Sequence, residues 1–77
     1  MPRYFFNIRD DAGVTQDREG EEFCDRDAAM HEAELAAREV AADAIRRGLP
    51  VPNRHIEVMD KDGKLAGTCD MRSVIER

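Results

Sequence analysis

One helical segment, residues 25–48, constrains the fold of this chain more than any other stretch. Asp25 stands at its start as an N-cap, because its carboxylate can accept first-turn amides, and Asp27 adds negative charge at the positive end of the helix dipole. At the other end, Gly48 suits the left-handed residue that closes a helix, and Pro50 prevents continuation. The sequence therefore predicts one helix of about six turns.

The apolar face of this helix is made mainly of methyl groups. At about 100° per residue, the apolar side chains fall on one stripe with two flanking positions: Ala29, Ala33, Ala36, Ala37, Val40 and Ala44, flanked by Met30 and Ala41. Because alanine is small, the helix can lie close to a sheet, and the sheet must supply the larger core residues. We expect Val40 at the centre of this contact, facing Phe6 and Ile8 of the first strand.

One hairpin is predicted on each side of the helix. Before it, residues 4–9 alternate between core-facing and outward positions, and the return strand, residues 14–24, is broken into two short pieces near Gly20. After it, a connector with two prolines leads to residues 55–59, which are joined to residues 65–71 by an Asp-Gly turn. The core-facing side of the last strand is expected to carry Leu65, Gly67, Cys69 and Met71.

These elements predict a single α+β domain over residues 1–77, with the order ββαββ. One long helix covers one face of a four-stranded antiparallel sheet, and residues 72–77 form a short helical turn. The second face of the sheet is expected to be a mixed surface made of Phe5, Asn7, Arg9, His55, Glu57, Met59, Ala66 and Thr68. Its apolar members, Phe5 and Met59, are one candidate protein interface.

The polar side of the helix carries a second, narrow apolar seam. Ala28, Leu35 and Ala42 repeat every seven residues, and Ile45 lies beside them. Two readings stay open, because single exposed leucines are common and two heptads are short for a coiled coil. In the other reading, Leu35, Ala42 and Ile45 pair helices between two protomers.

Composition excludes several classes of function. The formal net charge of −5, with both signs interspersed, disfavours nucleic-acid binding, which needs a clustered basic patch. No apolar run is long enough to span a bilayer, and the first ten residues lack the apolar core of a signal peptide, so we expect a cytoplasmic protein without a membrane partner. In that compartment Cys24 and Cys69 are expected to be reduced.

No catalytic, metal or cofactor site is predicted. His31 and His55 are too few for a metal site, and a calcium loop beginning at Asp60 would need a glutamate at its twelfth position, where Met71 stands. The acidic residues between 17 and 25 could gather a divalent ion loosely, but such acidic edge strands are commonly just solvated. Neither cysteine has a nearby histidine base in the sequence, so we expect no enzyme.

The chain resembles a family of short bacterial proteins of unknown function, typical of soil and plant-associated proteobacteria. The likeness lies in the opening MPRYFF, a DxEG box at Asp17, Glu19 and Gly20, and the Asp-capped alanine-rich helix, and it spans nearly the whole chain. This resemblance implies no activity. The chain is also similar, more weakly, to antitoxins of the partial ribonuclease-H-like class through the connector Gly48, Pro50, Pro52. Those antitoxins usually append a DNA-binding segment, and too few residues follow Met71 to form one.

The resulting hypothesis is a non-enzymatic protein-interaction or regulatory module, either homodimeric or bound to a partner. Its basis is the small core, the lack of a catalytic constellation and the partly apolar second sheet face. The alternatives are a small-ligand or metal-binding regulatory protein, which would use the acidic segment and His55, and an antitoxin-like protein that binds a toxin.

Overall fold

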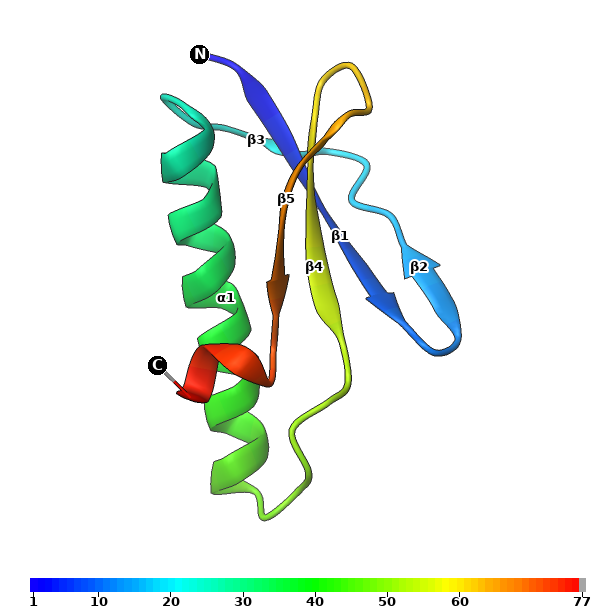
Figure 1. Ribbon diagram of the computed structural model, residues 1–77, viewed down its shortest axis with the longest axis vertical. Coiled ribbons are helices and arrows are strands. Elements are labelled where there is room, and N and C mark those ends of the chain that lie inside the picture. Colours follow the sequence, from blue (N-terminus) through cyan, green and yellow to red (C-terminus); the bar gives the residue numbers. More distant parts are fainter. Residues whose placement is uncertain (77) are drawn as a thin grey trace.

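The computed structural model describes residues 1–76, with the backbone alone for Glu76, and has one long helix on one face of an antiparallel sheet (Figure 1). The elements in chain order are β1 (Arg3–Asp10), β2 (Gly13–Thr15), β3 (Glu21–Glu22), α1 (Arg26–Arg46), β4 (His55–Asp60), β5 (Leu65–Asp70) and the 3-10 helix η1 (Ser73–Glu76). The strand order is β2-β1-β4-β5, and β3 also pairs with β1. The predicted α+β order and the broken return strand are confirmed, as is the short C-terminal turn, although its last residue, Arg77, lies outside the described residues.

Both ends of α1 are closed as the sequence predicts. The Asp25 carboxylate accepts a hydrogen bond from the Ala28 amide at 2.9 Å. At the other end, the Leu49 amide donates to the Ala44 carbonyl at 2.9 Å and the Gly48 amide donates to the Ile45 carbonyl at 3.1 Å, with Gly48 at φ +69°. This pair of bonds is a Schellman motif, which satisfies carbonyls that the end of a helix would otherwise leave unpaired.

The core combines small residues on the helix with larger ones on β4 and after β5. Ala29, Ala33, Ala37 and Ala41 are fully buried. The larger buried side chains are Ile56, Val58, Met71 and Val74. The sheet and the C-terminal turn therefore supply the bulk, as the alanine-rich stripe predicts, but the first strand supplies less of it than expected: Tyr4, Phe6 and Ile8 are only half-buried.

The predicted central position of Val40 is wrong. Its exposed fraction is 37%, whereas Ala41 beside it is 0% exposed. The reason is the placement of α1, which contacts β4, β5 and η1 and lies away from β2 at the far side of the sheet (Figure 1). The flank of the helix that carries Val40 is therefore left partly uncovered.

A register shift exchanges two residues of β5 between the faces of the sheet. Val58 pairs with Gly67 but Met59 pairs with Leu65, so β5 contains one extra residue at this point. Such an irregularity reverses the side to which the residues on one side of it point, which here are Leu65 and Ala66. Leu65, expected in the core, is 56% exposed, and Ala66, expected on the second face, packs against the core.

Two neighbouring helix positions test this arrangement. Ala41→Asp places a charge without a partner in the core and is expected to lower the free energy of unfolding by about 3 kcal/mol or more. Val40→Asp places the same charge at a partly exposed site and should cost less than about 1 kcal/mol. Urea unfolding followed by circular dichroism measures both variants, and equal losses would show that the buried face is assigned wrongly.

Candidate functional site

A groove between α1 and β1 has three aromatic side chains in its lining. It has a volume of about 300 Å³, and its apolar lining consists of Tyr4, Phe6, Phe23 and Ala36; we call it the aromatic groove. The Phe23 ring stacks on Phe6 with centroids 5.7 Å apart and planes 14° apart. The centroid of the Phe23 ring lies 6.2 Å from that of the Tyr4 ring, and the two ring planes are 58° apart. All three rings are half-buried.

The position of the helix creates this groove. Because α1 presents its buried alanines to β4 and β5, Tyr4 and Phe6 of β1 pack against the edge of the core, and the helix borders the groove above them with Glu32 and Ala36. Phe23, in the segment between β3 and α1, covers them in part. Its amide donates to the Pro2 carbonyl at 3.0 Å, which fixes this segment beside the start of β1.

Acidic side chains surround the aromatic groove. Asp17, Glu21 and Glu32 line it, and none of its described lining residues is basic. Glu21 and Glu32 are exposed, so their charges stand at the mouth of the groove. The site therefore combines aromatic surface with negative potential.

Asp17 holds together the edge of β1 where β2 has ended and β3 has not begun. Its carboxylate accepts hydrogen bonds from the backbone amides of Phe6 and Gly20, each at 3.1 Å, and from that of Glu19 at 3.3 Å. The Asp17 amide in turn donates to the Asn7 side-chain oxygen at 3.0 Å. Burial raises the pKa of Asp17, but the three amide hydrogen bonds outweigh burial and lower the pKa below its ordinary value.

Gly20 has a steric reason to be glycine. Its φ is +67°, and a Cβ at this position would lie 2.7 Å from the Tyr4 carbonyl oxygen and 2.8 Å from the Phe5 ring. The DxEG box thus builds the wall of the aromatic groove, with Asp17 as an acceptor of amides and Gly20 as a point of close approach. In the sequence this box carried a family resemblance, and the structure assigns it a local structural role.

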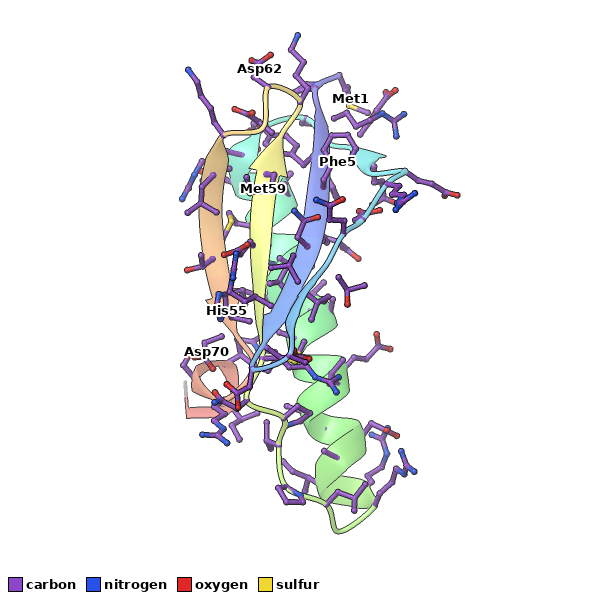
Figure 2. The ribbon with its side chains drawn as sticks, turned by 90° about the vertical axis from the view of Figure 1, so that its right-hand side faces the viewer. Met1, Phe5, His55, Met59, Asp62 and Asp70 are labelled. Atoms are coloured by element: carbon purple, nitrogen blue, oxygen red, sulfur yellow. The ribbon has the colours of Figure 1, made fainter. Side chains whose placement is uncertain are left out.

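The predicted interface residues Phe5 and Met59 lie side by side on the uncovered face of the sheet (Figure 2). Met59 also pairs with Leu65, so these three residues form an apolar row across β1, β4 and β5. A shallow hollow of about 570 Å³ includes Phe5 and Met59 together with charged residues of both signs. The sequence missed the third member, Leu65, because the register shift that turns it outward has no evident sequence signal.

The far end of the same face is charged. Arg9 donates to the Glu57 carboxylate at 2.9 Å, and this hydrogen bond is the main cause of the lowered pKa of Glu57. His55 lies 3.7 Å from the same carboxylate. His55 and Asp70 are neighbours across β4 and β5 at this end, distant from Phe5 and Met59 (Figure 2).

The other predicted interface residues lie on the helix. Leu35 is 43% exposed and Ile45 is 58% exposed, with Ala42 half-buried between them. They occupy the side of α1 that points away from the sheet. The structure therefore places the two predicted apolar surfaces on different parts of the molecule. It adds the aromatic groove, of whose lining the sequence pattern had assigned Tyr4, Phe6 and Ala36 to the core.

Other candidate chemistry is scattered. Within the described residues, no three histidine, cysteine, aspartate or glutamate side chains gather where they could hold a metal ion. Cys24 is exposed and Cys69 is buried, and the two do not form a disulfide. Among the same residues, no helix combines the length and the apolar character needed to cross a membrane.

Comparison with known proteins identifies a family but no characterised relative. The family model of a domain of unknown function, DUF6894, matches residues 3–72. Neither a curated protein nor a solved structure matches the chain. The resemblance to a family of unknown function is thus confirmed, and it covers both hairpins and the helix.

The role of Gly20 can be measured against a matched glycine. Gly48 has nearly the same φ, +69°, but a Cβ added there would have no atom within 4 Å, whereas a Cβ at Gly20 would have three closer than 3 Å. Gly48→Ala should cost about 1 kcal/mol from backbone strain, and Gly20→Ala about 3 kcal/mol from strain and overlap together. Chemical denaturation gives both values, and similar losses would exclude the steric argument.

The Asp17 carboxylate should make the stability of the fold depend on pH. Because its folded pKa is lowered, its ionised form stabilises the fold above the unfolded pKa, and this contribution disappears as pH falls through the folded pKa. Asp17→Asn, which has one fewer acceptor oxygen, is expected to melt several degrees below the parent at pH 7. At pH 3 the two melting temperatures should converge, and a gap that stays constant from pH 7 to pH 3 would contradict the role of the carboxylate.

Proposed function

This chain belongs to the DUF6894 family, and we propose that it is a non-enzymatic protein-binding module whose aromatic groove takes a basic segment of a partner protein. The segment would place one apolar side chain on the Phe6, Phe23 and Tyr4 rings, with lysine or arginine on either side. The observation that carries this proposal is the acidic, aromatic lining of the groove.

The aromatic rings of the groove favour binding of a partner through apolar contact. Three half-buried aromatic rings in one hollow leave apolar area in water, and covering such area contributes about 25 cal/mol per Å². Aromatic residues are also enriched at protein interfaces, where they act as anchors. A volume of about 300 Å³ is at the small end of ligand pockets and suits one or two side chains.

The negative charge of the groove and of the whole molecule favours a basic partner. Glu21 and Glu32 at the mouth, with Asp17 on the wall, favour cationic groups over acidic ones, and the net charge of −5 adds long-range attraction for a basic partner. A guanidinium or ammonium group near Tyr4 would gain a further cation–π contribution. Selectivity for basic segments follows from the groove and from the whole molecule alike.

Two other functions remain proposals of lower rank. A regulatory protein that binds a small ligand would use the same groove for an organic cation, and His55 would take no part, since it pairs with Arg9 across β1 and β4 and lies beside Glu57. An antitoxin-like role would be a special case of the proposed function in which the basic partner is a toxin. The cytoplasm, where the thiols of Cys24 and Cys69 would remain reduced, is the proposed location.

The proposal is tested with short labelled peptides whose binding is followed by fluorescence anisotropy. One peptide has a central phenylalanine flanked by lysines, and a second has the same phenylalanine flanked by glutamates. We expect the basic peptide alone to bind, with NMR shift changes at Tyr4, Phe6 and Phe23. Glu32→Lys should raise the dissociation constant of the basic peptide about fivefold, because one attractive charge becomes repulsive.

Asp11→Lys is the matched control, because it makes the same change in net charge in the exposed β1–β2 turn. It should leave the affinity within about twofold of the parent. Equal weakening by the two variants would mean that only net charge matters, and the absence of binding by either peptide at millimolar concentration would refute the groove as a peptide site.

A further inference from the structure

We propose that the cation which the aromatic groove selects is arginine rather than lysine, with the guanidinium group on the Tyr4 ring and its N–H groups donating to the Glu21 and Glu32 carboxylates. This inference rests on the proposed function, because it names the basic residue of the partner segment that carries the selectivity. The apolar side chain of the same segment lies beside the arginine, on Phe6 and Phe23.

The three carboxylates of the groove differ in whether they are free to bind a cation. The Asp17 carboxylate already accepts hydrogen bonds from three backbone amides. Among the described residues, by contrast, neither the Glu21 nor the Glu32 carboxylate has a partner in a hydrogen bond or an ion pair. Both are exposed at the mouth of the groove. The charge that a bound cation would meet is therefore that of Glu21 and Glu32.

These two carboxylates come from different elements that border the groove. Glu21 of β3 is paired with Tyr4 of β1, and paired residues of antiparallel strands place their side chains on the same face of a sheet. Glu32 lies four residues before Ala36 on α1, and residues with this spacing lie on the same side of a helix. A cation on the Tyr4 ring therefore has one carboxylate on the strand side and another on the helix side.

The Tyr4 ring is a surface distinct from the pair of phenylalanines. Phe6 and Phe23 are nearly parallel, with 14° between their planes, whereas the plane of Tyr4 is 58° from that of Phe23. An apolar side chain can therefore cover the two phenylalanines while a neighbouring cation lies on Tyr4. The groove volume of about 300 Å³ suits these two side chains together.

The shape of the guanidinium group matches this arrangement better than that of an ammonium group. Guanidinium is planar and stacks on an aromatic face, and its five N–H donors point outward in its plane. It can therefore contact the Tyr4 ring and donate to carboxylates on two sides at the same time. The lysine ammonium is a compact and strongly hydrated charge with three donors, so it gains less from the ring for the water it loses.

Three peptides of equal charge test this inference by fluorescence anisotropy. Each has a central phenylalanine, flanked by arginine, by lysine or by dimethylated arginine, which keeps its charge but loses N–H donors. The arginine peptide should bind about fivefold more tightly than either of the others.

The outcomes separate this inference from the proposed function. Equal affinities for the arginine and lysine peptides would overturn the inference and leave the groove as a site for basic segments. No binding by any of the three would refute the proposed function as well. A dimethylated peptide that binds as tightly as the unmodified one would overturn the role of the two carboxylates as acceptors.

Variants of the groove test the geometry through the ratio of arginine to lysine affinity. Glu21→Gln and Glu32→Gln should each lower this ratio about twofold, whereas Asp11→Asn, which removes the same charge in the exposed β1–β2 turn, should leave it unchanged. Tyr4→Leu should also lower the ratio, and Tyr4→Phe, which keeps a ring, should retain it. Circular dichroism checks the fold of each variant. A ratio that stays at the parent value in both glutamine variants would contradict the proposal whatever Tyr4→Leu does to stability.

Discussion

The contact between the alanines of α1 and the strands β4 and β5 is the constraint on which the other features depend. Four alanines with no exposed surface let the helix lie close to the sheet, and Met30 reaches Gly67 so closely that a Cβ there would be 2.7 Å from its sulfur. A contact of methyl groups contributes less free energy per residue than one of leucines. The remaining bulk comes from Ile56, Val58 and the residues after β5, so the centre of the core lies beneath β4 and β5 and away from β1.

The helix-facing side of β1 is only partly covered because the core is displaced toward β4 and β5. Its aromatic residues face the helix side of the sheet, but the apolar helix residue that borders the groove beside them, Ala36, is too small to cover them. Phe23 and the segment before it fill part of the space. This segment depends on the Asp17 carboxylate, which accepts amides that a continuous β2 strand would otherwise have paired. Asp17, which lines the groove, thus also satisfies backbone amides at the interruption of the edge strand.

Much of the fold could be predicted from local chemistry, and the features that could not depend on the placement of whole elements. The Asp25 cap, the Gly48 end and the alternation in β1 act over a few residues, so the sequence determines them directly. Helical periodicity gives the direction of an apolar stripe only to within about one residue, and it placed Val40 inside where the structure buries Ala41. The exposed Leu65 depends on one extra residue in the pairing of β5 with β4, which no turn residue or pattern announces.

The candidate site was less predictable than the fold because its residues have the same pattern as a core. Tyr4 and Phe6 alternate correctly for a buried face, and only the position of α1 decides whether that face is covered. A useful signal was nevertheless present: a helix that offers almost only alanine cannot fill the space above three aromatic rings. The sides of α1 therefore differ in what they contact. The alanine side forms the core, the flank with Glu32 and Ala36 borders the groove, and the outward side exposes Leu35 and Ile45.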